Sequence, residues 1–308
     1  MNTPRINVLG VGISTLTLDS TVELVVQSLA EGRQGYVTLT GVHGVSECQS
    51  DERLREIHNQ SMLTAPDGMP LTWMGRPQGV GPKQMNRVYG PDLMLRIFER
   101  GQQEGLRHYF FGGNEGVAEL LKEKLTRRFP LAQIVGTHTP PFRPLTEDEE
   151  IRLVEELNRL RPHCLWVGLS TPKQERFMAQ FLQRYGEAAN STPRLARPLV
   201  MLGVGAAFDF HVGLVPQAPR WMQRAGLEWF YRLHQEPRRL WRRYLKNNPL
   251  FLARVALQLS GLRKYELHSD LNTSSFAMSA TTLASDIPDS PCQRSCLNNT
   301  SSNVTLRN

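Results

Sequence analysis

Residues 108–129, HYFFGGNEGVAELLKEKLTRRF, decide the fold class. The stretch opens with His108–Phe111, an aromatic-rich segment that predicts a buried strand. Two glycines follow, and the remainder carries apolar residues at helical spacing, namely Val117, Leu120, Leu121 and Leu125. A buried strand that turns through glycine into an amphipathic helix is the building unit of an α/β protein.

The same unit recurs on both sides of this stretch. Strands are predicted at residues 6–12, 36–40, 134–136, 164–169 and 199–204, and helices at 20–30, 45–60, 93–100, 147–160 and 172–185. The strands are apolar throughout, which is typical of a sheet covered on both faces. We therefore expect an α/β fold with a Rossmann-like, mostly parallel sheet covered by helices, followed by a basic helical appendage.

Positive charge is concentrated in one segment of the 308-residue chain. Residues 219–264 contain 11 basic and 2 acidic side chains, whereas residues 1–218 contain 23 of each, and the net charge of the whole chain is +7. This distribution argues against a uniformly basic nucleic-acid-binding protein and predicts a localised anionic partner. We expect an α/β core at 1–218, a basic, aromatic appendage of two or three short helices at 219–265, and a disordered tail at 266–308.

The composition also narrows the cellular location. No run of about 20 apolar residues is present, so no membrane-spanning helix is expected. The first ten residues lack the apolar stretch of a signal peptide. The four cysteines are scattered: Cys48 and Cys164 lie in patterned segments and are expected as buried thiols, and the Cys292/Cys296 pair lies in a tail poor in histidine, where no zinc site is expected. A reducing cytoplasm fits this distribution.

Two segments between the predicted helices at 45–60 and 93–100 carry candidate functional groups. Residues 65–70, Ala-Pro-Asp-Gly-Met-Pro, place Asp67 in a turn-rich loop, where a carboxylate can act as a general base. An aspartate before glycine is also an ordinary turn residue. Arg87 lies in Arg-Val-Tyr-Gly-Pro-Asp and is suited either to an anion or to a structural role, and Asp92 suits the first turn of the following helix.

The turn at Gly112 and Gly113 can bring backbone N–H groups and a helix N-terminus close to a phosphate. Its spacing is not that of the dinucleotide-binding fingerprint, and a tight turn without a ligand fits it equally well.

Polar residues also follow two later strands. Thr171, Lys173 and Gln174 gather near a helix N-terminus in residues 167–175, at the carboxyl end of a strand, where ligands bind in open α/β sheets. Helix capping by Thr171 or its neighbour is the alternative. Asp209 follows the small residues after the last strand and adds either a polar ligand or a group that fixes the loop.

The basic segment interleaves arginines with aromatic side chains. On a continuous helix, Arg232, Arg239 and Arg242 would share one face, and guanidinium groups bind phosphates through paired hydrogen bonds. The aromatic side chains suit a membrane interface or a single-stranded nucleic acid.

Six motifs, in this order, resemble the WecG/TagA/CpsF glycosyltransferases, glycosyltransferase family 26. The resemblance extends from about Ile6 to Tyr244. The motifs are Pro66–Met69, Arg87–Asp92, Gly112–Val117, Val167–Glu175, Gly203–Asp209, and Gly226–Trp229 with Glu236–Arg239. It implies an inverting, UDP-sugar-dependent hexosyl- or N-acetylhexosaminyltransferase of bacterial cell-surface or exopolysaccharide synthesis. The acceptor would be an undecaprenyl-diphosphate-linked saccharide at the cytoplasmic face of the cell membrane.

The resemblance also assigns roles to particular residues. Asp67 matches the proposed catalytic base and Gln174 a polar residue of the donor site. Arg232, Arg239 and Arg242 match arginines of an appendage that closes over the active site and holds the diphosphate. Members work without the Asp-x-Asp metal motif, which this sequence also lacks, so no metal or other cofactor is expected.

One position departs from the family pattern. Many members read Thr-x-Asn after the second strand, whereas this chain has Gly41 at the position of the Asn, with Thr40 and His43 as neighbours that can substitute for it. The departure favours the exopolysaccharide branch of the family. The expected partners are a UDP-sugar, a polyprenyl-diphosphate-linked acceptor and the anionic membrane surface, with no nucleic acid, and self-association is open. The alternative is a non-catalytic nucleotide- or anion-binding module with a basic arm for a membrane or nucleic acid.

Overall fold

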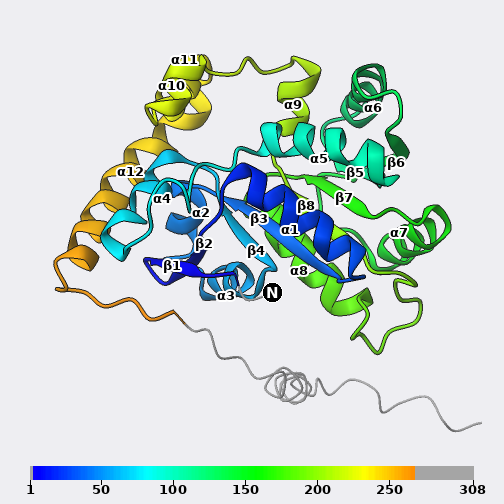
Figure 1. Ribbon diagram of the computed structural model, residues 1–308, viewed down its shortest axis with the longest axis horizontal. Coiled ribbons are helices and arrows are strands. Elements are labelled where there is room, and N and C mark those ends of the chain that lie inside the picture. Colours follow the sequence, from blue (N-terminus) through cyan, green and yellow to red (C-terminus); the bar gives the residue numbers. More distant parts are fainter. Residues whose placement is uncertain (1–2, 268–308) are drawn as a thin grey trace, which may run out of the picture. The chain divides into compact units, whose positions relative to one another are not determined.

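A parallel β-sheet forms the centre of the protein (Figure 1). The computed structural model describes residues 3–267, and within this range the sheet has six strands. They are β3 (Gly35–Thr40), β4 (Leu63–Pro66), β5 (Arg107–Gly112), β6 (Gln133–His138), β7 (Cys164–Gly168) and β8 (Val200–Gly203). Their order is β4-β3-β8-β7-β5-β6, and every neighbouring pair is parallel. The predicted α/β fold is confirmed, and the carboxyl ends of all six strands meet at one edge.

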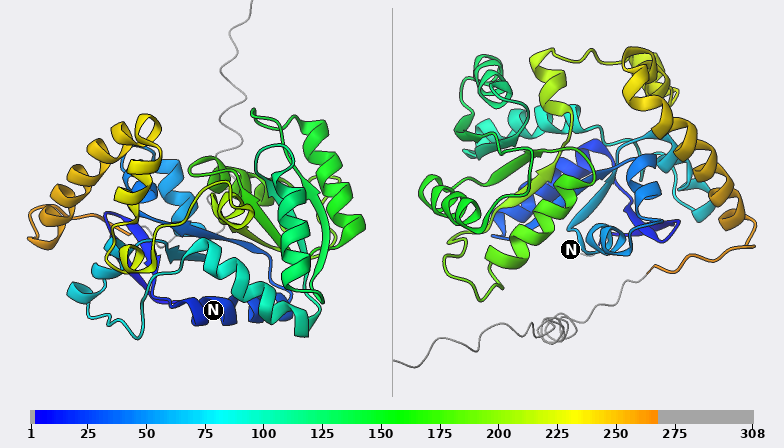
Figure 2. Two further views of the ribbon diagram at one scale, coloured as in Figure 1. Left: turned by 90° about the horizontal axis from the view of Figure 1, so that it is seen from above. Right: turned by 180° about the vertical axis from the view of Figure 1, so that it is seen from behind.

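Helices cover both faces of this sheet (Figure 2). They are α1 (Leu18–Ala30), α5 (Gly90–Glu104), α6 (Val117–Arg128), α7 (Glu147–Leu160), α8 (Lys173–Tyr185) and the short α9 (Ala207–Val212). On one face, α1, α5 and α6 pack around Phe110 and Trp166, and on the other, α7 and α8 pack around Tyr109 and Phe111. Neighbouring residues of β5 thus enter opposite cores, as the two-residue period of a strand requires. This two-sided burial explains the continuous apolar runs.

The segment 6–12, expected as one strand, is a hairpin. Its strands β1 (Arg5–Val8) and β2 (Val11–Ser14) pair antiparallel and lie outside the six-stranded sheet. Leu9 and Gly10 join them with φ angles of 54° and 83°. The chain therefore reverses in a two-residue turn with both residues in the left-handed region, a turn that matches the twist of a hairpin.

The single helix expected over residues 45–60 is divided in two. The short helices of this region are α2 (Val42–Glu47), α3 (Glu52–Gln60) and α4 (Met69–Trp73). Asp51 separates the first two, because its side chain accepts a 2.9 Å hydrogen bond from the backbone N–H of Leu54 and caps α3. The turn-rich segment around Asp67 contains β4 as well as α4, so it is more regular than its composition indicated.

Three helices form the appendage, namely α10 (Arg220–Arg224), α11 (Glu228–Gln235) and α12 (Pro237–Leu259). With 23 residues, α12 is longer than the short helices expected here, because the helix continues through Pro249. The chain leaves helical conformation at Glu236, just before a proline, with φ −128° and ψ 59°. Arg232 therefore lies on α11 and Arg239 and Arg242 on α12, and the continuous helix on which the three would share a face does not form.

The appendage packs against the core, and the two belong to one compact unit. Phe251 of α12 is only 4% exposed, in an apolar cluster with residues of the β1–β2 hairpin. Gln258 accepts a 3.0 Å hydrogen bond from the backbone N–H of Leu9. At the other end, Arg220 pairs with Asp92 of α5 at 3.0 Å. The buried Phe251 and the Gln258 bond hold α12 against the core, whereas the largely exposed Arg220–Asp92 pair adds little.

The sequence also predicts a disordered C-terminal tail and no membrane-spanning helix. The predicted tail at 266–308 falls outside the described residues from position 268 onward. Within residues 3–267, no helix combines the length and the hydropathy needed to cross a membrane.

Candidate active site

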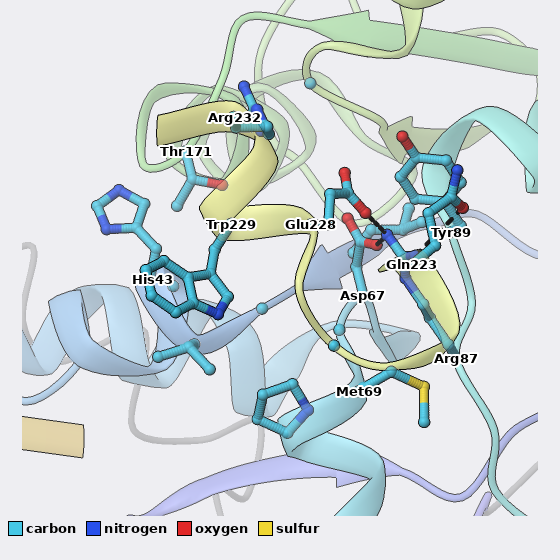
Figure 3. A pocket seen from close by; sticks show the side chains of 18 of the residues that line it. His43, Asp67, Met69, Arg87, Tyr89, Thr171, Gln223, Glu228, Trp229 and Arg232 are labelled. Atoms are coloured by element: carbon cyan, nitrogen blue, oxygen red, sulfur yellow. Dashed lines mark hydrogen bonds and ion pairs between the residues drawn. The ribbon is translucent and has the colours of Figure 1, made fainter. Parts of the chain in front are cut away.

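A cavity of about 680 Å³ lies where the loops after the strands meet the appendage (Figure 3). This volume is within the range of small-molecule sites, about 300–1,000 Å³. Its lining is of two kinds. The polar part includes Asp67, Arg87, Thr171, Gln174 and Arg232. The apolar part includes Trp73, Pro77, Phe251, Leu252, Val255 and Leu259, from α4 and its following turn and from α12.

Asp67 is fixed by the ends of two neighbouring strands. It directly follows β4, and its backbone N–H donates a 2.9 Å hydrogen bond to the carbonyl of Thr40 at the end of β3. Gly41 approaches so closely that a Cβ at this position would lie 2.9 Å from the backbone oxygen of Asp67. The absence of a side chain at Gly41 thus allows the two loops to meet.

The pKa of the Asp67 carboxyl lies close to neutral pH. Its side chain is 30% exposed, while the atom Oδ1 is buried and has no hydrogen-bond partner within the described part of the chain. Burial raises the pKa of Asp67 to about 6; Arg87 and Arg232 lower this pKa, and Glu228 raises it. An accessible carboxylate with this pKa is suited to general base catalysis.

Arg87 lies between two carboxylates. Its Nη2 donates to Glu228 of α11 and lies 3.6 Å from Asp67 Oδ1 (Figure 3). Its Nη1 donates to the side chain of Gln223 of α10 at 3.4 Å, and the Tyr89 ring stacks 4.0 Å from the guanidinium carbon. Burial lowers the pKa of Arg87, but Asp67 and Glu228 outweigh it and raise the pKa overall. Arg87 therefore stays charged.

Seven residues predicted for the site line the cavity, namely His43, Asp67, Arg87, Thr171, Gln174, Asp209 and Arg232. Gln174 is 2% exposed, and its Oε1 accepts a 3.0 Å hydrogen bond from the backbone N–H of Gly205 after β8. Thr171 and Gln174 both donate to Glu175, at 2.8 and 3.1 Å. These bonds fix the loops after β7 and β8, so Gln174 shapes this wall of the cavity.

Four predicted residues lie outside the lining. Thr40 is buried and holds the backbone of Asp67. The two glycines pack the ends of β5 and β7 together, because Gly113 donates to the carbonyl of Gly168 at 3.1 Å and a Cβ on Gly112 would lie 2.6 Å from the same oxygen. Lys173 is exposed at the start of α8. Close strand packing therefore accounts for the glycines.

Of the three appendage arginines predicted for the site, only Arg232 has a side chain that the structure describes. Arg232 lines the cavity, its guanidinium carbon lies 5.7 Å from the centre of the Phe210 ring, and its buried Nε has no hydrogen-bond partner within residues 3–267. The backbones of Arg239 and Arg242 belong to α12, but their side chains lie outside the described part of the structure.

The sequence prediction missed Glu228, Gln223 and Tyr89. Glu228 is one of only two acidic residues in the strongly basic segment 219–264 and belongs to the Gly226–Trp229 motif. An isolated acidic residue in a basic segment is the sequence feature from which Glu228 could have been predicted as a site residue. Gln223 and Tyr89 carry no such signal, because their role depends on contact with Arg87.

Side chains that could coordinate a metal ion do not cluster in the described part of the chain. No group of three or more His, Cys, Asp or Glu side chains within residues 3–267 is arranged to hold a metal ion. Metal-independent chemistry stays a prediction.

The comparison with known families agrees with this arrangement. A family model described as the glycosyl transferase WecG/TagA/CpsF family matches residues 6–265. The match includes the sheet, the loops around Asp67 and all three helices of the appendage. Members are glycosyltransferases, and such enzymes take a sugar donor and an acceptor. The chain belongs to the WecG/TagA/CpsF family of glycosyltransferases.

Proposed function

We propose that the protein is an inverting glycosyltransferase that moves a hexose or N-acetylhexosamine from a UDP-sugar to an undecaprenyl-diphosphate-linked saccharide in cell-surface or exopolysaccharide synthesis. One observation carries the proposal: the Asp67 side chain, which is 30% exposed, lines a cavity with both a polar and an apolar lining. The polar part suits a nucleotide sugar, and the apolar part suits the lipid of the acceptor.

In the proposed reaction, Asp67 accepts the proton of an acceptor hydroxyl while that oxygen bonds to the anomeric carbon of the donor. The bond from this carbon to the UDP oxygen breaks, and UDP leaves with the electron pair. A single displacement from the opposite side inverts the anomeric centre. The reaction needs the ionised carboxylate, which predominates above about pH 6.

Positive side chains would stabilise the departing diphosphate without a metal ion. Arg232 lines the cavity, so its guanidinium group can donate hydrogen bonds to a phosphate oxygen. We propose that Arg239 and Arg242 add to this charge. Fixed guanidinium groups at a site of developing negative charge lower the barrier electrostatically.

The appendage also suits peripheral binding at the cytoplasmic face of the cell membrane. Exposed apolar side chains occur on all three of its helices, including Trp221, Phe230, Trp241, Leu245 and Leu252. The same segment carries a net charge of +9. Apolar anchors surrounded by basic residues favour a surface of anionic lipids.

An assay of a UDP-sugar panel against lipid-diphosphate-linked saccharides tests the proposed function. Transfer with inversion in the presence of EDTA is the expected result. Absence of transfer with every pair of substrates, together with thermal stabilisation by oligonucleotides and not by UDP, would favour the binding-module alternative.

A further inference from the structure

We propose that Glu228 is a positioning residue that draws the Arg87 guanidinium away from Asp67 and so frees the carboxylate to act when α11 lies over the site. The inference rests on the proposed role of Asp67 as the base. It assigns the appendage a function in preparing that base, beyond binding a diphosphate.

Two carboxylates compete for the same nitrogen atom. Arg87 Nη2 is in hydrogen-bond contact with Glu228, whereas Asp67 Oδ1 lies 3.6 Å from it, beyond hydrogen-bond distance. Gln223 accepts from Nη1. Both terminal nitrogens of Arg87 are thus held by side chains of the appendage, and Asp67 Oδ1 has no hydrogen bond within the described residues.

The position of Glu228 depends on the turn before α11. Gly226 has a φ of 72°, and a Cβ there would lie 3.1 Å from the Trp73 ring and 3.2 Å from Met69 Cβ. This close approach brings the start of α11 against α4, which begins two residues after Asp67. The carboxylate of Glu228 therefore reaches Arg87 only when the turn is seated on α4.

Without Glu228, Arg87 would close the present 3.6 Å separation and donate a hydrogen bond to Asp67. The Tyr89 ring stacks on the guanidinium from the core side and keeps it near its present position. The charged and titratable groups acting on Asp67 are Arg87 and Tyr89 of the core and Glu228 and Arg232 of α11. Loss of the Glu228 charge alone leaves Arg232 in place, so both the lost repulsion and the new ion pair would favour the ionised form of Asp67.

Titration of Asp67 in the full-length protein tests this directly. The chain is labelled with ¹³C at the aspartate carboxyls, and the Asp67 signal is assigned by its loss in Asp67→Asn. In Glu228→Gln the midpoint should fall from about pH 6 toward the ordinary aspartate value of about 3.9. Arg220→Gln is the matched control, because it removes an exposed ion pair of the appendage that does not contact Arg87, and its midpoint should stay at the wild-type value.

A second variant covers the case in which Glu228→Gln fails to fold. Arg87→Gln removes the competing cation, and the Asp67 midpoint should then rise above that of the wild type. Adding Glu228→Gln to Arg87→Gln should lower the midpoint less than Glu228→Gln does alone, because no guanidinium is left to move. Equal effects in the two backgrounds would overturn the inference, as would an unchanged midpoint in folded Glu228→Gln.

Activity separates this inference from the proposed function. In Glu228→Gln the acidic limb of the kcat/KM profile should move to lower pH together with the carboxyl midpoint. If the wild type transfers no sugar but the midpoint moves, the proposed function fails and the electrostatic arrangement stands. If transfer occurs and neither limb nor midpoint moves, Glu228 does not position Arg87.

Discussion

The nearest terminal nitrogen of Arg87 lies 3.6 Å from the Asp67 carboxylate, close enough for strong attraction and too far for a hydrogen bond. A hydrogen-bonded ion pair would hold the pKa of the carboxyl low and weaken it as a base. Removal of the cation would leave the carboxyl to burial, which raises its pKa. The observed separation keeps Asp67 largely ionised at neutral pH, while its 30% exposed side chain stays open to the cavity.

Asp67→Asn should reduce transfer by roughly 10²–10⁴-fold, the range for loss of a general base. The amide has nearly the same shape and cannot accept the proton, so the fold and the binding of UDP should persist. Turnover with a UDP-sugar and calorimetric binding of UDP measure the two effects. Asp92→Asn is the control, since it breaks only the surface pair with Arg220. Near-normal turnover of Asp67→Asn would refute the assignment of the base.

The rate of transfer should fall as the pH drops through about 6. Burial raises the pKa of Asp67, so its proton is bound at a higher pH than on an ordinary aspartate, whose pKa is about 3.9. Only the ionised form can act as a base, so kcat/KM should decline in proportion to the ionised fraction on the acidic side. Circular dichroism at each pH shows whether the protein stays folded. An acidic limb near pH 4 would show that the environment of Asp67 does not raise its pKa.

Gly41→Ala should disturb Asp67 specifically. The added methyl would lie 2.9 Å from the Asp67 backbone oxygen, so the loops after β3 and β4 must separate. We expect a loss of transfer of tenfold or more, about 1.4 kcal/mol in activation free energy. Gly81→Ala is the control, because the nearest atom to its new methyl would be 3.8 Å away. Equal activity of the two variants would mean that the loop tolerates a side chain.

Much of the fold could be predicted from the sequence because buried strands and amphipathic helices leave local signals. The strand at 108–111 and the helix after it are recovered as β5 and α6 for this reason. Short elements carry too few residues for such a signal, and four-residue β4, which contains a proline, was described only as a turn.

The candidate site was only partly accessible from the sequence. Thr171 and Gln174 could be found because they follow a predicted strand, and Asp67 because its loop and a family motif marked it. The Arg87–Glu228 pair joins positions 141 residues apart, and only the packing of α11 over the sheet brings them together. No local pattern contains that information.

Phe251→Ala should destabilise the protein by about 3–5 kcal/mol, the usual cost of removing a buried phenylalanine side chain. Phe251 is 4% exposed and joins α12 to the cluster around the β1–β2 hairpin. Its neighbour Leu252 is 66% exposed, so Leu252→Ala should change stability little. Urea unfolding measures both variants. Similar unfolding midpoints for the two would mean that α12 does not pack on the hairpin in solution.

Gly226→Ala should weaken transfer by displacing α11. Two effects add: alanine at a φ of 72° is strained by roughly 1–2 kcal/mol, and its methyl would press against Trp73 and Met69. Gly79→Ala separates them, because Gly79 has a φ of 78° and no described atom lies within 4 Å of the place its methyl would take. Both variants should lose similar stability in urea, but only Gly226→Ala should lose activity and lower the midpoint of the acidic limb. Parallel losses of activity in both variants would show that backbone strain, and not the seating of α11 on α4, accounts for the effect.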